Sequence, residues 1–88
     1  MFKVTSDQQS GVGVTFRLEG RLTGVWVDEF AREVESAING RATVTLNLDG
    51  LSFADHRGVA IIRGAVERGA RAMGGSEFID RLIWEEAR

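Results

Sequence analysis

The chain has 88 residues, of which 11 are Lys or Arg and 13 are Asp or Glu, so its formal net charge is −2. Apolar residues make up 43% of the chain, and together with the small net charge this excludes a disordered polymer and predicts one folded domain over residues 1–88. The absence of cysteine excludes a disulfide framework and thiolate metal sites. The acidic balance argues against nucleic-acid binding by phosphate neutralisation. The sequence has no apolar run of roughly 18 residues and no signal-peptide core, so we expect a cytoplasmic domain without direct membrane insertion.

Two short strands are predicted at the start of the chain. Phe2 and Val4 begin a weak alternation that stops at the polar residues 7–11, which are typical of a hairpin loop. Apolar and polar residues then alternate strictly from Val12 to Leu18, and Gly20 marks the end of this strand. Because the two strands are separated by so short a loop, we expect them to pair antiparallel.

The period changes to that of a helix after Thr23. Thr23 is the expected N-cap and Gly40 the expected C′ residue, and Trp26 flanks the apolar face. We expect Trp26 and Trp84 to lie partly in the core rather than to stack on ligands. The apolar positions at helical spacing are Val27, Phe30, Ala31, Val34 and Ile38.

The second half of the chain predicts a strand over 43–48, rich in β-branched residues, and then two more helices. Asp55 is the expected N-cap of the first helix and Gly69 its stop. A short strand over 70–73 and a turn at 74–75 lead to a last helix capped by Ser76. The apolar faces predicted for the two helices are Val59, Ile62, Ala65 and Val66, and Phe78, Ile79, Leu82 and Ile83.

The predicted order is strand, strand, helix, strand, helix, short strand, helix. It indicates an α/β fold of the mixed α+β kind: a small single domain with a four-stranded mixed sheet, an N-terminal hairpin and about three helices packed on the sheet.

The segment from Leu46 to Ile62 carries a family resemblance. Its central run, Leu48-Asp49-Gly50-Leu51-Ser52-Phe53-Ala54-Asp55-His56-Arg57-Gly58, resembles the signature of STAS domains, the family of anti-sigma-factor antagonists and sulfate-transporter tails. Residues 16–23 are similar to the family's second strand and first turn, and residues 68–71 to the end of its second helix. The resemblance covers roughly residues 12–83.

The resemblance implies partner switching. In the family, a Ser or Thr directly after the residue matching Asp55 is phosphorylated by a kinase that is also an anti-sigma factor. Phosphate adds a charge of about −1.5 to −2, which releases the domain from its partner. This sequence departs from the pattern, because His56 occupies the phosphorylation-equivalent position and Arg57 follows it. We therefore expect no Ser/Thr phospho-switch there, and the nearest hydroxyl, Ser52, is expected to lie before the helix.

The spacing of the polar residues in this segment does not indicate catalysis or metal binding. Asp49, Asp55 and His56 lack the spacing of known metal sites, and no Ser–His arrangement indicates a triad. Asp55 fits both a helix cap and a partner contact. The glycine-rich residues 11–13 and 74–76 match neither a dinucleotide nor a Walker A motif. We therefore expect a non-enzymatic protein without metal or cofactor, although phosphate binding by Arg57 at the helix tip is left open.

The helix that starts at Asp55 is the best candidate for a docking surface. Its outer face combines small residues with an apolar anchor and a basic rim, whereas a face built for solubility holds more Glu and Lys. By resemblance the partner is an anti-sigma factor or a related kinase; the alternative is the ATPase of a lipid ABC-transport system, with this chain as accessory subunit. A merely solvated face and weak homodimerisation are left open. The predicted contacts are Asp55, His56, Arg57, Gly58, Ala60 and Ile61.

Overall fold

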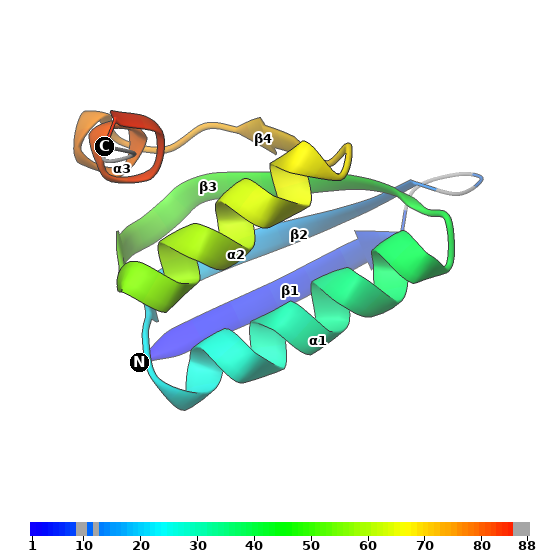
Figure 1. Cartoon of the computed structure of the whole chain (residues 1–88), viewed down its shortest axis with the longest axis horizontal. Helices are drawn as coiled ribbons and strands as arrows, with labels where there is room; N and C mark the ends of the chain where they lie inside the picture. Colours follow the sequence, from blue (N-terminus) through cyan, green and yellow to red (C-terminus); the bar gives the residue numbers. More distant parts are fainter. Residues whose placement is uncertain (9–10, 12, 86–88) are drawn as a thin grey trace.

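The computed structural model describes residues 1–8, 11 and 13–85. Its elements follow the predicted order, with strands and helices alternating after an opening hairpin (Figure 1). They are β1 (Phe2–Gln8), β2 (Gly13–Leu22), α1 (Val25–Asn39), β3 (Thr43–Ala54), α2 (His56–Glu67), β4 (Arg71–Met73), α3 (Glu77–Asp80) and η1 (Arg81–Glu85), a π-helical continuation of α3.

The four strands form one sheet in the order β1-β2-β3-β4. Strand β1 runs antiparallel to β2, whereas β2, β3 and β4 are parallel, which confirms the mixed sheet and the N-terminal hairpin. Asp7 and Gln8, predicted in the hairpin loop, belong to β1. The loop residues 9 and 10, and Val12 of the predicted second strand, fall outside the described residues.

The core lies between the sheet and the two long helices, which run side by side in Figure 1. The inward positions of β2 are Val14, Phe16 and Leu18, all buried, and they alternate with outward polar residues. Phe30 of α1 is fully buried and meets the rings of Phe2 and Phe16 edge to face. This ring geometry is favourable for aromatic pairs, so α1 is anchored over the hairpin.

Strand β3 is longer than the sequence predicts. The expected strand ended at residue 48, but β3 continues to Ala54 and pairs with β2 as far as Leu22 opposite Ala54. Register shifts interrupt the pairing near Arg17–Glu19 and Gly20–Arg21. The cross-strand partner compensates for the weak strand propensity of Asp49 and Gly50, and it brings the end of β2 next to the start of α2.

The ends of α1 differ from the prediction. Its N-cap is Gly24, so the assignment of Thr23 was wrong, and Gly24 has no side chain to cap the helix. At the other end Gly40 has φ −80°, and the positive φ falls on Arg41 at 66°. Arg41 N–H donates to the Ile38 carbonyl at 2.9 Å, so the helix ends one residue later than expected.

The predicted end of α2 at Gly69 is confirmed, because Gly69 has φ 108° directly after the last turn.

The C-terminal helical segment is capped by Ser76, whose hydroxyl accepts a hydrogen bond from Ile79 N–H at 3.1 Å, as predicted. Ile79 and Ile83 are fully buried, but Phe78 is 54% exposed and stacks on Phe53 instead of entering the core. Trp26 and Trp84 are 37% and 39% exposed, so both are partly buried, as predicted, at the edge of the core. No helix in the described part of the chain is long and apolar enough to cross a membrane.

Candidate functional site

The carboxylate of Asp55 lies between the first turns of both long helices. One oxygen, Oδ1, accepts a hydrogen bond from Gly58 N–H at 2.8 Å and so caps α2, as predicted. The other, Oδ2, accepts from Gly24 N–H at 3.1 Å, at the start of α1. The Asp55 backbone N–H donates to the Leu22 carbonyl at 3.0 Å, which ties the end of β2 to the same point. One side chain therefore fixes where α1 and α2 begin relative to each other.

These contacts explain the acidity of Asp55. The hydrogen bond from Gly58 N–H, joined by that from Gly24 N–H and by the nearby Arg57 charge, holds the pKa of the Asp55 carboxyl below its ordinary value. Partial desolvation opposes this shift but does not outweigh it. Hydrogen bonds donated to a carboxylate favour its charged form, so Asp55 is ionised at neutral pH.

His56 and Arg57 form the exposed tip of α2. Arg57 makes an ion pair with Asp28 in the first turn of α1, and both side chains are about half exposed. The pair neutralises one charge on each helix and adds a second link between the two helix starts, while the imidazole of His56 remains accessible at the tip.

Gly58 is buried, unlike its neighbours at the tip. A Cβ at this position would lie 2.9 Å from the Leu22 carbonyl oxygen and 3.1 Å from Leu22 Cγ. The absence of a side chain is therefore needed for the close approach of α2 to the end of β2. Of the predicted contacts, Gly58 is the one placed inside the fold rather than on its surface.

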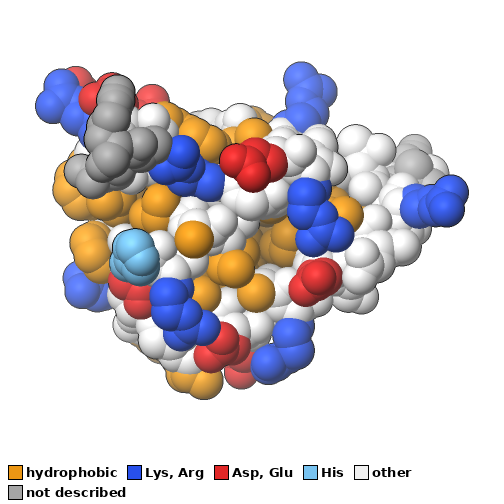
Figure 2. Space-filling view, viewed as in Figure 1, with side chains coloured by type: hydrophobic (Ala, Val, Ile, Leu, Met, Phe, Trp, Pro, Cys, Tyr) orange, Lys and Arg blue, Asp and Glu red, His pale blue; other side chains and the backbone are white. Residues whose placement is uncertain are grey.

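Ala60 and Gly64 lie one helical turn apart and form a low ridge along α2, which we call the α2 ridge. A Cβ on Gly64 would meet nothing within 4 Å, so the backbone is uncovered there. Hollows lie on both sides, and both residues line each of them. In Figure 2, hydrophobic side chains show around this helix and charged side chains surround them.

The larger hollow is a groove of about 620 Å³ between α2 and the C-terminal helical segment. Its floor and walls are largely apolar, and its rim carries His56 and the Arg63–Glu67 turn. The lining residues are Phe53, Ala54, Asp55, His56, Val59, Ala60, Arg63, Gly64, Glu67 and Leu82.

The smaller hollow, about 140 Å³, lies between α2 and α1. Ile61, predicted as an exposed apolar anchor, is half-buried and faces this hollow together with Val34 and Ile38 of α1. Val59 and Val66, predicted on the core face, are only partly buried, and Val59 lines the larger groove. Ile62 and Ala65 are buried as predicted, and Gly58 is the third buried residue of α2.

Sequence reasoning missed three groups of residues at this site. Phe53 and Leu82 are separated by almost thirty residues and line one groove only because the C-terminal segment packs against α2, so no local pattern indicates them. Arg63 was not considered as a rim residue. Val25 and Trp26 are exposed in the first turn of α1, which Asp55 ties to the α2 tip. A signal for the last pair was available, because Val25, Trp26 and Val27 are consecutive and one helix face cannot bury all three.

The remaining polar residues of the motif form hydrogen bonds within the sheet and its turns. Asp49 and Ser52, the other polar residues of the motif, belong to β3: Asp49 accepts from Gly75 N–H at 2.9 Å, and Ser52 donates to the Gly20 carbonyl at 3.0 Å. Ser52 thus lies before the helix, as predicted. Within the described residues, no group of three or more His, Asp or Glu side chains is placed to hold a metal ion.

Comparison with known proteins identifies the class of this chain. The STAS domain family matches residues 3–79, so the chain belongs to the STAS family. Among curated proteins, none matches the chain in sequence.

Solved structures show the same fold at low sequence identity. The Bacillus cell fate determinant SpoIIAA in its phosphorylated form is 22% identical, with a TM-score of 0.77 over 97% of this chain and 84% of that one. An anti-sigma-factor antagonist from Mycobacterium paratuberculosis is 10% identical, with a TM-score of 0.74 over 98% and 80%. The STAS domain of an anti-sigma-factor antagonist from Rhodobacter sphaeroides is 24% identical, with a TM-score of 0.65 over 86% and 92%. The mixed four-stranded fold of anti-sigma-factor antagonists is therefore confirmed for this chain.

Proposed function

We propose that this STAS domain is a non-catalytic module that binds a regulatory protein through the α2 ridge and the groove beside it. The observation that carries the proposal is the ridge itself: the exposed Ala60 and the side-chain-free backbone at Gly64 lie between two hollows on α2, the helix that contains the end of the family motif. Small residues let a partner helix or strand approach closely, and the groove offers apolar walls for a large side chain of the partner.

The family and its structural relatives favour one kind of partner. Three of the solved structures with this fold are described as anti-sigma-factor antagonists. We accordingly propose an anti-sigma factor, or a kinase related to one, as the partner. The proposed contacts are Asp55, His56, Arg57, Ala60 and Ile61. The buried Gly58 positions them, because it lets α2 pack closely against the end of β2.

The proposed binding is not controlled by a Ser/Thr kinase at the tip of α2. His56 is exposed where the family carries its hydroxyl residue, and neither it nor Arg57 accepts a phosphoryl group from such a kinase. Incubation with the cognate kinase and ATP, followed by mass spectrometry, should leave residues 55–64 unmodified. A phosphate found on this segment would contradict this part of the proposal.

The docking surface is tested by capture of partners from the host lysate with three forms of the protein. Ala60→Arg places a large charged side chain on the exposed ridge without touching the core. Thr43→Arg makes the same addition at an exposed position on the opposite face of the sheet and serves as the matched control. We expect an anti-sigma factor with wild type and Thr43→Arg but not with Ala60→Arg.

Two results would contradict the proposal. Equal capture by all three forms would show that the α2 ridge is not the contact surface. Capture of a transporter ATPase, lost in Ala60→Arg, would keep the surface but replace the sigma-factor pathway by transport. Circular dichroism of both variants checks that each retains the fold.

A further inference from the structure

The edge of the sheet formed by β1 lies away from the α2 ridge and carries a distinct pattern. Strand β1 is the first strand in the sheet order, and among the described residues no strand pairs with its outer side (Figure 1). It is seven residues long, whereas the other edge strand, β4, has three. Long free edges invite pairing with another chain, and proteins generally shorten or block them.

The backbone groups that face outward on this edge can be assigned. Arg21 N–H donates to the Met1 carbonyl at 3.0 Å, so Met1 points its polar groups toward β2. Backbone direction alternates along a strand, and Lys3, Thr5 and Asp7 therefore also face β2. In the part of the chain that the structure describes, the outward N–H and C=O groups without a strand partner belong to Phe2, Val4, Ser6 and Gln8.

We propose that this edge pairs with the same edge of a second copy, in an antiparallel register centred on Thr5. That register places all four outward-facing residues in hydrogen-bonded pairs, Phe2 with Gln8 and Val4 with Ser6, twice each. Registers shifted by two residues leave part of the strand unpaired. The result is a two-fold symmetric dimer with one continuous eight-stranded sheet.

The charges select the same register. With Thr5 at the centre, Lys3 of one copy lies opposite Asp7 of the other, at both ends of the paired segment. These are non-hydrogen-bonded positions, where opposed side chains come closest. Both residues are exposed on the face of the sheet away from the helices, so they are free to meet across the interface.

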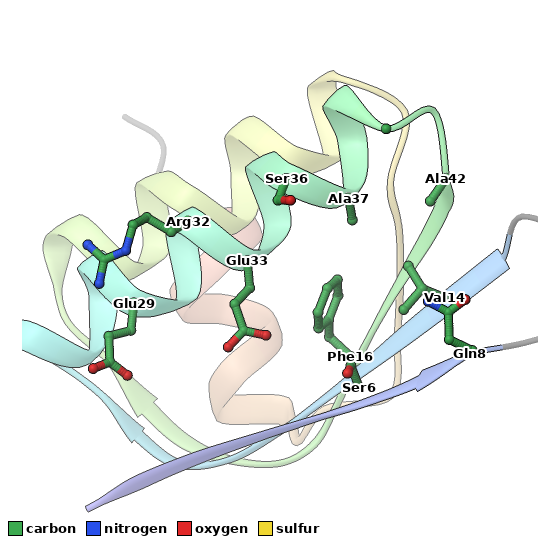
Figure 3. Close-up of a pocket in the computed structure, with 11 residues that line it drawn as sticks. Ser6, Gln8, Val14, Phe16, Glu29, Arg32, Glu33, Ser36, Ala37 and Ala42 are labelled. Atoms are coloured by element: carbon green, nitrogen blue, oxygen red, sulfur yellow. The ribbon is translucent and has the colours of Figure 1, made fainter.

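The groove in Figure 3 shows why the edge has room for a partner. It occupies about 550 Å³ between α1 and the hairpin, and Ser6 and Gln8 of β1 line it on the side facing α1. Helix α1 therefore leaves Ser6 and Gln8, in the C-terminal half of β1, exposed. In the proposed register, Val4 and Phe2 of the second copy lie beside these two polar residues. A seven-residue strand pair alone buries less than the roughly 1,200 Å² typical of stable interfaces, so we expect a weak dimer.

Charge reversal separates this pairing from simple protection of an edge by charged residues. Lys3→Asp and Asp7→Lys each place like charges opposite one another twice per dimer, and each should weaken dimerisation by about 2- to 30-fold. The double variant Lys3→Asp/Asp7→Lys recreates both pairs with the charges exchanged and should recover the wild-type affinity. A charged edge that only prevents aggregation predicts no such recovery.

A backbone test complements the charge test. Ser6→Pro removes an N–H that faces outward, so it spares the ladder to β2 but breaks two hydrogen bonds of the dimer. Ser6→Ala is the matched control. Sedimentation velocity over a concentration series, up to about 1 mM, should show a dimer for wild type and Ser6→Ala and a monomer for Ser6→Pro. Thermal unfolding checks that Ser6→Pro is folded.

Three outcomes would overturn the inference: a wild-type monomer at every concentration, no recovery in the double charge variant, or a dimer that persists in folded Ser6→Pro. A strand of another protein captured on this edge, with the wild type monomeric, would likewise overturn it. Because these measurements use the purified chain and do not touch α2, their failure leaves the proposed function unaffected.

Discussion

Helices α1 and α2 pack side by side against the sheet, but their starts and their exposed faces are built differently. Helix α2 is capped by the residue that precedes it, Asp55, while α1 starts at Gly24 and uses the second oxygen of that same Asp55. Helix α1 exposes charged residues such as Glu29, Arg32 and Glu33, as expected of a solvated face. Helix α2 exposes Ala60 and the backbone at Gly64. The comparison teaches that the helix capped by its own preceding residue is also the one whose exposed face holds small residues in place of charges, and this is the face that we propose for the partner.

Removal of the Asp55 carboxylate should have the largest effect, because it serves both helices. Asp55→Ala leaves the N–H groups of Gly58 and Gly24 without their acceptor, and at roughly 1 kcal/mol for each cap the free energy of unfolding should fall by about 2 kcal/mol. Asp55→Asn keeps one acceptor oxygen and should cost about half as much. Urea unfolding measures both. Equal stability of Asp55→Ala and wild type would break the shared-cap account.

Two glycines of α2 should respond to alanine in opposite directions. Gly58→Ala forces a Cβ against the Leu22 carbonyl at 2.9 Å and should lower the free energy of unfolding by about 1–2 kcal/mol. Gly64→Ala meets open space and should raise it by about 0.5–1 kcal/mol, because alanine is the better helix former. Thermal unfolding of the two variants compares them directly. The same sign for both would show that the two positions do not differ in packing.

Acid should weaken the junction of the two helices through Asp55. Its pKa is lowered in the folded state, so its stabilising contribution is complete above the ordinary aspartate pKa of 3.8 and is lost as the pH falls through the lower folded value. Asp55→Asn cannot titrate. The difference in unfolding free energy between wild type and Asp55→Asn should therefore be constant near neutral pH and shrink below about pH 4. A difference that stays constant in acid would contradict the assignment.

Of these interactions, the ion pair between Arg57 and Asp28 should contribute least to the free energy of unfolding. Both side chains are about half exposed, and such pairs stabilise by about 0.2–1 kcal/mol. A double-mutant cycle with Arg57→Gln and Asp28→Asn isolates the coupling, which should decrease in high salt. A coupling well above 1 kcal/mol that persists in salt would indicate that this pair, rather than Asp55, joins the two helix starts.

Local rules predicted the features of the fold that depend on neighbouring residues. The caps at Asp55 and Ser76 and the stop at Gly69 were correct, because a side chain within three residues, or a glycine with positive φ, supplies what the helix end lacks. The start of α1 was wrong, since the oxygen near it comes from a residue 31 positions away. The length of β3 was also wrong, because its second half is held by β2 rather than by its own alternation.

At the candidate site too, some residues could be predicted from the local sequence, whereas others depend on contacts between distant segments. The sequence indicated Asp55, His56, Arg57 and Ala60 as exposed or half-exposed residues around the start of α2, and the structure places them there. It did not reveal that Ile61 turns toward α1, that Gly58 is buried, or that Leu82 closes a groove with Phe53. Those positions depend on how α1 and the C-terminal segment pack against α2.

By itself, then, the sequence determined the order of the elements, most of the core positions in the strands and in α1, the capped start of α2 and the family of the chain, because short-range hydrogen bonds, backbone preferences and side-chain alternation are all encoded within a few residues. Tertiary structure alone decided the shared role of the Asp55 carboxylate, the two hollows beside the α2 ridge and the position of β1 at the edge of the sheet. Each of these arises where segments far apart in the chain come into contact, and no local pattern fixes which segments those are.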